Sequence, residues 1–295
     1  MKRSQREESD ALVRQYRSDL NTAVTEAIHI AEYRSRWRTL TAASRSLPPQ
    51  AMTLLALGDH SRGPPLIDLK RKDSYSKSKM PVDLYYVPGS APCRTVLLAA
   101  KALKVDLNLK LVDLHHGEHL KPEYLKINPQ HTVPTLVDDG FSVWESRAII
   151  TYLANKYAKG SPLYPEEPKA RALVDQRLYF DIGTLYQRFS DYFYPQVFGG
   201  APADKEKLAK VEDALKLLDQ FLEGQKFAAG PALTLADLSL VASVSSMEAS
   251  DVNFNKYNNI KRWYETVKMS APNYEEANGK GLQAFKELVN NMMKK

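Results

Sequence analysis

The stretch Val82-Asp-Leu-Tyr-Tyr-Val-Pro-Gly-Ser-Ala-Pro-Cys-Arg94 decides the fold, because within a few residues its pattern changes from that of a strand to that of a helix. Residues 82–87 form a short apolar and aromatic run, which a Pro-Gly pair ends. Pro92 suits the first turn of a helix. The sequence therefore predicts a strand, then a helix over 94–103, with Ser90 just before the helix N-terminus.

The residues that follow continue this alternation of strand and helix signals as far as position 157. Leucines alternate with polar residues over 107–111, which is the period of a half-buried strand. Apolar runs over 133–137 and 141–143, joined by an Asp-Gly turn, predict a hairpin, and a helix is predicted over 146–157. The order β-α-β, loop, β-β-α is typical of a small thioredoxin-like sheet whose first β-α-β unit is parallel.

The second half of the chain is predicted to be entirely helical. Three prolines within 158–168 end the first pattern. Beyond them, apolar residues recur at helical spacing, at Leu178, Ile182, Leu185 and Phe189 and again at Leu208, Val211, Leu215, Leu218 and Leu222. Thr234 and Asp237 predict a capped helix start. We therefore predict an α/β thioredoxin-like domain over 81–158, a linker over 159–168 and an all-helical domain over 169–295.

The charge of the chain is unevenly distributed. The 295 residues have a net charge of +6 and a pI of about 9.1, which suggests nucleic acid or an anionic membrane as a partner. However, residues 1–80 hold 15 of the 41 Lys and Arg and nine of the 35 Asp and Glu. Residues 81–295 hold 26 of each and are neutral, so we expect no nucleic acid or membrane to bind them. No apolar run approaches the ~20 residues of a membrane span.

Residues 1–80 are predicted to be a basic, poorly ordered extension. They combine an Arg-rich stretch, a Pro/Gly/Ser-rich stretch and the polar run 70–79, which is typical of a linker. Binding of nucleic acid or an acidic membrane by this extension is an alternative. The acidic residues argue against a transit peptide. An upstream translated region, a gene-model artefact and a functional tail all stay open.

Ser90 has two interpretations. It is either a helix cap or a chemical group, since free amides and the helix dipole favour an anion at this position. A serine hydroxyl can donate to a bound thiolate and lower the pKa of the thiol. The single cysteine, Cys93, excludes a disulfide framework and a Cys-cluster metal site. Without a thiol at position 90, we expect Cys93 to be a packed apolar residue rather than a nucleophile.

Three further groups have the same ambiguity. His131 either binds a carboxylate or occupies a loop. Glu145 and Ser146 begin a helix, where they act as caps or form a cradle for a zwitterion, with Glu145 facing an ammonium group and Ser146 a carboxylate. Eight aromatic side chains crowd residues 179–198. They belong to the core in part, and an apolar cleft for a hydrophobic ligand is the second interpretation.

Taken together, these segments resemble arthropod delta-class glutathione S-transferases. The first half contributes Met80-Pro-Val-Asp-Leu-Tyr-Tyr-Val-Pro-Gly-Ser-Ala-Pro-Cys-Arg, Gly117-Glu-His-Leu-Lys-Pro-Glu, Ile127-Asn-Pro-Gln-His-Thr-Val-Pro-Thr-Leu-Val-Asp and Trp144-Glu-Ser-Arg-Ala-Ile. The second half contributes Gln176-Arg-Leu-Tyr-Phe-Asp, Gly183-Thr-Leu-Tyr-Gln, Tyr194-Pro-Gln-Val-Phe and Leu222-Glu-Gly-Gln. The resemblance covers about 215 residues from Met80, in order, and leaves the extension outside it.

The resemblance implies a role for individual residues. Ser90 would stabilise the glutathione thiolate, the backbone before a cis-proline would pair with the cysteinyl unit, and histidines would hold the glycine end. The implied glutathione site comprises Ser90, His119, His131, Thr132, Val133, Pro134, Glu145, Ser146 and Arg147, of which the last three would hold the γ-glutamyl end. The implied pocket for the electrophile comprises Tyr186, Phe189, Tyr194, Phe198 and Phe285. Tyr179 resembles an aromatic residue of the dimer interface.

The function that the resemblance implies is conjugation of glutathione to hydrophobic electrophiles by a cytoplasmic homodimer. Detoxification would be the purpose, with peroxidase or dehydrochlorinase side activity. Glutathione would be a co-substrate, and no cofactor or metal is expected. The alternative is a non-catalytic, transferase-like domain that binds glutathione or another protein. Ser90 and the Glu145-Ser146-Arg147 segment favour the enzyme, because such non-catalytic domains often lack the activating residue.

Overall fold

The computed structural model describes residues 82–250 and 252–293. They lie within one compact unit, Met80–Lys295. The predicted extension 1–80 lies outside the described residues, as do Met80 and Pro81, which begin the first of the segments quoted for the resemblance.

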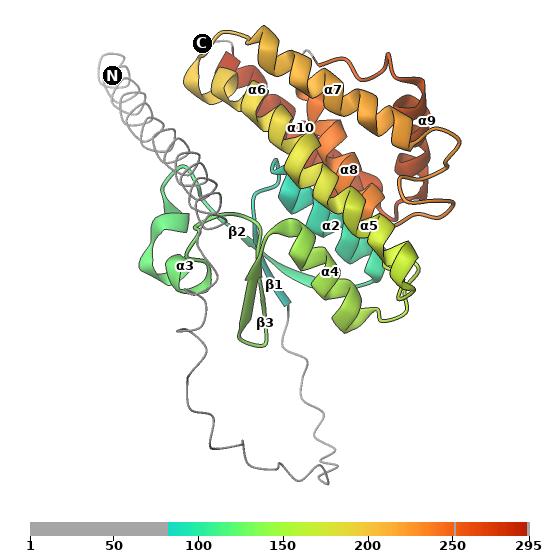
Figure 1. Ribbon diagram of the computed structural model, residues 1–295. Coiled ribbons are helices and arrows are strands. Elements are labelled where there is room, and N and C mark those ends of the chain that lie inside the picture. Colours follow the sequence, from blue (N-terminus) through green and yellow to red (C-terminus); the bar gives the residue numbers. More distant parts are fainter. Residues whose placement is uncertain (1–81, 251, 294–295) are drawn as a thin grey trace, which may run out of the picture. The chain divides into compact units, whose positions relative to one another are not determined.

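The first half of the described chain is built on a sheet of four strands in the order β2-β1-β3-β4 (Figure 1). The strands are β1 (Val82–Tyr86), β2 (Leu107–Leu111), β3 (Thr135–Asp138) and β4 (Phe141–Trp144). β1 is parallel to β2, whereas β3 is antiparallel to both β1 and β4. The predicted parallel β-α-β unit and the predicted thioredoxin-like sheet are therefore confirmed.

The connections between the strands follow the predicted order. They contain α2 (Ala91–Leu103), η2 (Glu118–Leu120) and α3 (Pro122–Ile127), and α4 (Ser146–Tyr157) follows β4. The predicted hairpin joins β3 to β4 through Asp139 and Gly140, whose φ angles of 52° and 80° suit a tight turn between twisted strands. The helix predicted over 94–103 begins three residues earlier, because Ser90 caps it and Pro92 fits its first turn.

The strand at 107–111 differs from the prediction of a half-buried strand. Leu109 and Leu111 are 45% and 65% exposed. The strand forms as predicted, but β2 lies at the edge of the sheet. Side chains at its carboxyl end therefore lack a neighbouring strand on one side. For this reason, the leucines that alternate with polar residues are not buried on one face of the strand.

The second half of the described chain is entirely helical. Its elements are α5 (Pro168–Phe180), η3 (Asp181–Leu185), α6 (Tyr186–Gly199), α7 (Lys205–Phe221), α8 (Leu235–Ser246), η4 (Met247–Ala249), α9 (Asn258–Ser270), η5 (Glu275–Gly279) and α10 (Lys280–Met293). Every residue of α8 is buried, because α2, α4, α5, α9 and α10 all contact it. Its apolar composition all round matches this central position.

The start of α8 has the predicted cap. The carboxylate of Asp237 accepts hydrogen bonds from the backbone N–H of Thr234 at 2.9 Å and of Ala228 at 2.7 Å. It also accepts a bond from the indole N–H of Trp263 at 2.8 Å. Thr234 and Asp237 form the reciprocal capping box, so one buried carboxylate joins the start of α8 to the preceding loop and to α9.

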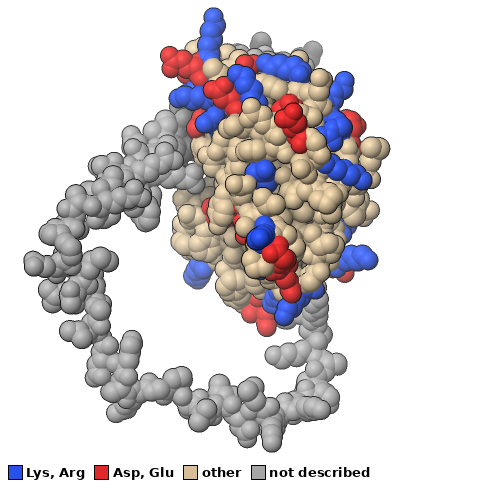
Figure 2. All heavy atoms as spheres, turned by 45° about the vertical axis from the view of Figure 1, so that its right-hand side comes forward, with Lys and Arg blue, Asp and Glu red and all other residues tan. Residues whose placement is uncertain are grey.

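The two halves share one continuous core. α2 packs against α4 on the sheet side and against α8 on the helical side. Buried apolar side chains of α2, among them Val96 and Leu98, belong to the same cluster as Leu240 and Val244 of α8. Among the described residues, no helix is long and apolar enough to cross a membrane. Lys, Arg, Asp and Glu side chains intermingle on the face seen in Figure 2, as expected for a folded part without net charge.

Candidate functional site

The register of the sheet brings three separate loops to one end of it. Tyr85 pairs with Thr135, and Thr135 pairs with Trp144. The loop that follows β1 and carries Ser90 therefore leaves the sheet beside the loop that enters β3 and the turn that follows β4. β2 ends at the same level, since Leu111 pairs with Tyr86. All the glutathione-site residues implied by the sequence follow or precede strands at this end.

Ser90 is half-buried and occupies the N-cap position of α2. Its hydroxyl oxygen accepts a bond from the backbone N–H of Cys93, but the distance of 3.4 Å is long for a hydrogen bond. The carbonyl oxygen of Ser90 accepts from the N–H of Arg94 at 2.9 Å. A hydroxyl that only accepts from the backbone keeps its own proton to donate, so capping and stabilisation of an anion are compatible at this residue.

Cys93 is a packed residue, as predicted. It is fully buried, and its sulfur accepts from the backbone N–H of Val87 at 3.5 Å. Burial raises the pKa of its thiol to about 11, although hydrogen bonds and nearby Arg94 act in the opposite direction. The thiol is therefore protonated at neutral pH and is not a nucleophile.

The second loop at this end contains the implied histidine and proline. His131 has a φ of 46°, and the Val133–Pro134 peptide bond is cis, as the resemblance implied. The imidazole ring of His119, from η2, lies with its centroid 6.2 Å from that of His131. The two histidines implied for the glycine end of glutathione are therefore neighbours, although twelve positions separate them in the sequence.

The third segment is the turn between β4 and α4. Glu145 occupies the N-cap position with a φ of 69°, is exposed and makes no capping hydrogen bond through its side chain. Glu145 therefore stands at the cap position, but the interpretation that its side chain caps the helix is wrong, because its carboxylate accepts no bond from the helix amides. Ser146 is buried, and its hydroxyl oxygen accepts from Arg147 Nη1 at 2.8 Å.

The aromatic residues of the helical half form a cluster against this end of the sheet. The hydroxyl groups of Tyr186 and Tyr194 lie 2.9 Å apart, and burial raises the pKa of both phenols. The ring centroid of Phe285, on α10, lies 6.3 Å from that of Tyr194. A Cβ added to Gly89 would lie 3.4 Å from Cα of Phe285, so α10 packs directly against the loop that carries Ser90.

The aromatic residues implied for the pocket differ in exposure. Tyr186, Tyr194 and Phe198 are half-buried, with 5.8 Å between the ring centroids of the last two. Phe189 has no exposed surface, and its ring stacks on Phe193 at 5.2 Å between centroids. Phe189 therefore belongs to the core, and its implied role as a residue that lines a pocket is wrong, because it has no surface to offer a ligand. This agrees with the expectation that part of the aromatic set belongs to the core.

Comparison with known proteins matches both halves of the described chain. Residues 84–162 match the glutathione S-transferase N-terminal domain, and residues 180–271 match the glutathione S-transferase C-terminal domain. A delta-class glutathione transferase from Nilaparvata lugens is 60% identical, covers 72% of this chain and 100% of its own, and has a TM-score of 0.71. The chain belongs to the glutathione S-transferase family.

Other insect transferases are similar as well. A glutathione transferase from Bombyx mori is 44% identical over 70% of this chain and 97% of its own, with a TM-score of 0.69. Glutathione transferase E6 from Drosophila melanogaster is 40% identical over 72% of this chain and 97% of its own, with a TM-score of 0.68. The delta-class resemblance, the two-domain transferase fold and membership of the transferase class of enzymes are therefore confirmed.

Asn128 of this transferase was missed by the sequence analysis. It is fully buried, and its amide donates to the carbonyl oxygen of Thr132 at 2.9 Å and to Thr135 Oγ1 at 2.8 Å. Tyr124 Oη donates to the same carbonyl oxygen at 2.7 Å. These bonds fix the loop between His131 and Pro134. No local pattern marks Asn128, because its partners become visible only once the loop is folded.

Asp181 of the transferase was missed for a similar reason. It is fully buried in η3, and its Oδ2 accepts from Arg147 Nη2 and from Ser239 Oγ, both at 2.5 Å. The guanidinium of Arg147 also lies 5.7 Å from the centroid of Tyr186. Arg147 therefore joins the turn after β4 to the helical half. In the sequence, Asp181 is one acidic residue among many in a helix and has the pattern of a surface group.

Within residues 82–250 and 252–293, no group of three His, Cys, Asp or Glu side chains lies close enough to hold a metal ion. The implied glutathione residues at this end of the sheet include an exposed carboxylate at Glu145, a buried hydroxyl at Ser146 and imidazoles at His119 and His131. Tyr179, on α5, is 76% exposed and lies outside this cluster.

Proposed function

We propose that this transferase conjugates glutathione to hydrophobic electrophiles at Ser90. The observation that carries the proposal is the register Tyr85–Thr135–Trp144, which gathers the loops bearing Ser90, His131 and Glu145 at one end of the sheet. Each loop offers the group that one part of glutathione needs: a hydroxyl for the thiolate, imidazoles for the glycine carboxylate and a carboxylate for the γ-glutamyl ammonium group.

In this proposal glutathione is held at both ends, which places its sulfur beside Ser90. Val133 supplies backbone N–H and C=O groups to the cysteinyl unit, and Thr132 and Pro134 keep that segment extended. The Ser90 hydroxyl and the N-terminus of α2 then stabilise the thiolate. Binding at both ends also converts the attack on the second substrate into a reaction between positioned groups.

The proposed pocket for the second substrate lies between α6 and α10. Tyr186, Tyr194, Phe198 and Phe285 would contact an apolar electrophile, while Phe189 supports them from the core. The thiolate attacks the electrophilic carbon, a carbon–sulfur bond forms and the leaving group departs with the electron pair. Reduction of organic hydroperoxides and elimination of chloride are the side activities that the same thiolate would support. Detoxification is consistent with all three reactions.

Two further parts of the proposal concern assembly and location. We propose a homodimer in which Tyr179 contacts the partner, because Tyr179 and Leu173 on α5 are 76% and 47% exposed. Size-exclusion chromatography with light scattering tests this. Tyr179→Ala should shift the transferase toward monomer, whereas Met269→Ala, on α9 and 80% exposed, should not. We also propose a cytoplasmic location and no cofactor other than glutathione as co-substrate.

The proposed role of Ser90 is tested with an immobilised-glutathione column and a chloronitrobenzene conjugation assay. The protein should bind the column, elute with free glutathione and conjugate the test substrate. Ser90→Ala should lose most activity and stay folded, with a thermal unfolding midpoint lowered only by the loss of one long capping bond. The exposed Ser270→Ala is the control. Unchanged activity in Ser90→Ala would exclude the assigned role. Binding to the column without any conjugation by the natural protein would instead support the non-catalytic alternative.

A further inference from the structure

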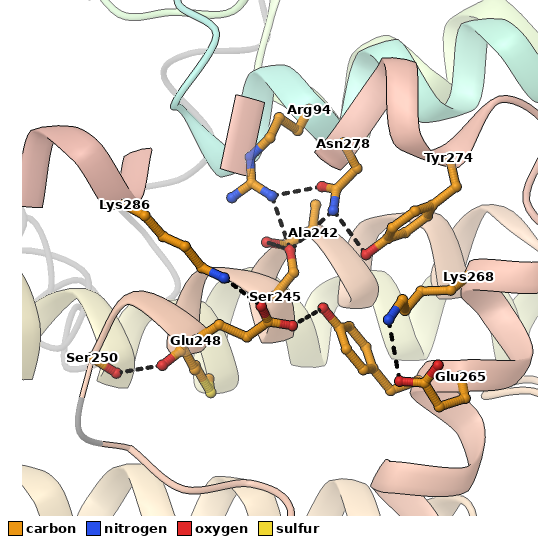
Figure 3. A network of polar contacts seen from close by, with 12 residues as sticks. Arg94, Ala242, Ser245, Glu248, Ser250, Glu265, Lys268, Tyr274, Asn278 and Lys286 are labelled. Carbon is orange, nitrogen blue, oxygen red and sulfur yellow. Dashed lines mark hydrogen bonds and ion pairs between the residues drawn. The ribbon is translucent and has the colours of Figure 1, made fainter. Parts of the chain in front are cut away.

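Arg94 is a buried cation one helical turn beyond Ser90. Its side chain has no exposed surface, and its guanidinium crosses from α2 to the helical half (Figure 3). Arginine keeps its proton in proteins, so this group is charged even though burial lowers its pKa. A buried charge is costly unless something specific stabilises it.

The hydrogen-bond partners of Arg94 are all neutral. Nη1 donates to Asn278 Oδ1 at 2.6 Å and to Ser245 Oγ at 2.9 Å, and Nη2 donates to Ser246 Oγ at 2.5 Å. The two serine hydroxyls in turn donate to the carbonyl oxygen of Ala242 at 3.1 and 2.9 Å. The guanidinium therefore lies at the C-terminal end of α8, where the helix dipole is negative.

Among the described residues, no carboxylate forms an ion pair with Arg94. The acidic residues Glu248 and Asp181 have other partners. Lys286 and Tyr264 donate to the carboxylate of Glu248, and Arg147 pairs with Asp181. The positive charge of Arg94 is thus held by dipoles and hydroxyl oxygens, and its field is not cancelled by an adjacent negative charge.

This field reaches the groups around the proposed thiolate site. The positive charge of Arg94 acts to lower the pKa of Cys93 on α2, of Tyr186 and Tyr194 on α6, and of Tyr274 at the start of η5, against the stronger effect of burial. Cys93 supplies the amide that contacts the Ser90 hydroxyl, and the two α6 tyrosines belong to the proposed pocket. Ser90 therefore adjoins Cys93, one of the residues on which the charge of Arg94 acts.

The aliphatic part of Arg94 also contacts the structure that supports Ser90. A Cβ added to Gly281 on α10 would lie 2.8 Å from Arg94 Cδ and 2.3 Å from the carbonyl oxygen of Pro88. The loop before Ser90, the Arg94 stem and α10 are therefore packed without space between them. A change at Arg94 is transmitted directly to the backbone of that loop.

We propose that Arg94 is a positioning residue of the transferase, whose buried, unneutralised charge favours the thiolate form of glutathione held at Ser90 and whose hydrogen bonds fix the start of α2 against α8. The inference rests on the proposed function. The ionisable groups that face Arg94 from the surrounding elements are Cys93, Tyr186, Tyr194, Tyr264 and Tyr274, with the Glu248–Lys286 pair beyond them.

The decisive variant is Asn278→Asp, because it places a negative charge 2.6 Å from Arg94 Nη1 with little change in shape. This variant also loses the amide N–H that donates to Tyr274 Oη at 2.9 Å. Tyr274→Phe is the neutral control for that lost bond. Lys101→Met is the control for charge. Lys101 also lies on α2, and its Nζ forms an ion pair with Glu276 Oε1 of η5 at 3.0 Å, but Lys101 is exposed.

The measurement is the thiol pKa of enzyme-bound glutathione, followed by ultraviolet thiolate absorbance, together with the pH profile of kcat. Asn278→Asp should raise the thiol pKa by about one unit and so lower kcat about tenfold below that pKa. The deficit should disappear at alkaline pH, which a merely structural defect would not show. Tyr274→Phe and Lys101→Met should keep the natural thiol pKa.

An unchanged thiol pKa in Asn278→Asp, in an active and folded protein, overturns the inference, and so does an equal shift in Tyr274→Phe. Arg94→Gln is a second variant, for which we expect the same rise of the thiol pKa. If Arg94→Gln does not fold, Asn278→Asp still tests the inference, because it keeps the arginine. A natural protein without glutathione-dependent conjugation would reject the proposed function itself. If the natural protein is active and the Asn278→Asp variant has the same thiol pKa, only the role of Arg94 would be rejected.

Discussion

Gly281 on α10 lies against the backbone of Pro88, two residues before Ser90, so closely that an added Cβ would lie 2.3 Å from the carbonyl oxygen of Pro88. A backbone oxygen in a packed loop cannot move aside as the end of a long side chain can. Gly281 is therefore the residue that allows α10 to seat Phe285 over the loop bearing Ser90.

Replacement of Gly281 by alanine should weaken both the fold and the site. Overpacking of this kind costs about 1–3 kcal/mol of unfolding free energy, and we expect conjugating activity to fall with it because α10 or the loop must shift. Gly183→Ala is the control, since nothing lies within 4 Å of a Cβ there. Urea unfolding and a conjugation assay compare the two. Equal stability and activity in Gly281→Ala would contradict the close approach.

Glu145 should affect binding of glutathione rather than stability. Its side chain makes no capping bond, so Glu145→Ala should raise the KM for glutathione while the thermal midpoint stays near that of the natural protein. Glu145→Gly should raise the KM for glutathione by the same factor and should be at least as stable as Glu145→Ala, because a φ of 69° suits glycine. Loss of folding in either variant would show that the residue is structural.

Asp237 should be essential for stability and not for chemistry. Asp237→Ala leaves the buried N–H groups of Ala228, Thr234 and Trp263 without an acceptor, which should cost about 3 kcal/mol or more. Asp213→Ala, which removes an exposed ion pair with Lys216, should change stability by less than about 1 kcal/mol. Chemical denaturation measures both. Equal midpoints for the two variants would contradict the central position of α8.

Asp138 should make stability depend on pH in the acid range. Burial alone would raise the pKa of its carboxyl, but hydrogen bonds from Lys156, Tyr157 and Tyr152 outweigh burial and hold the pKa below its ordinary value of 3.8. A lowered pKa in the folded state stabilises the fold above the unfolded-state pKa, and this stabilisation is lost as the pH falls through the folded-state pKa.

The difference in unfolding free energy between the natural protein and Asp138→Asn should therefore be large at pH 7 and shrink below about pH 4. Urea titrations at pH 7 and pH 3 measure it. Asp139→Asn is a suitable control, because Asp139 is the exposed next residue and asparagine tolerates its φ of 52°. A difference between the natural protein and Asp138→Asn that is the same at both pH values would exclude the assigned cause.

Much of the fold follows from local sequence patterns. Pro92 and Ser90 mark the start of α2, Asp139 and Gly140 mark the hairpin, and Thr234 with Asp237 marks the start of α8. Each of these signals acts over a few residues, through caps and turns. The exposure of Leu109 and Leu111 could not be predicted in this way, because it depends on which strand lies at the edge of the sheet.

The candidate site was predictable where a recognisable motif also indicates the role of a residue. Ser90, His131 and Glu145 stand in such motifs, and the sheet brings their loops to one end. Asn128, Asp181 and Arg94 stand in motifs as well, but they act through partners that are 4 to 184 positions away in the sequence. Their roles come from burial and from hydrogen bonds in the folded chain, which no pattern of spacing encodes.

The position of Arg94 has a consequence for how the molecule opens. Its acceptors all lie in α8 and η5, so a chain cut between the two halves would leave a guanidinium in an apolar surface without those partners. We therefore expect that the two halves do not unfold separately at the domain boundary near residue 162, where the N-terminal family match ends. Amide hydrogen exchange should show α2 and α8 opening as one foldon, with equal protection.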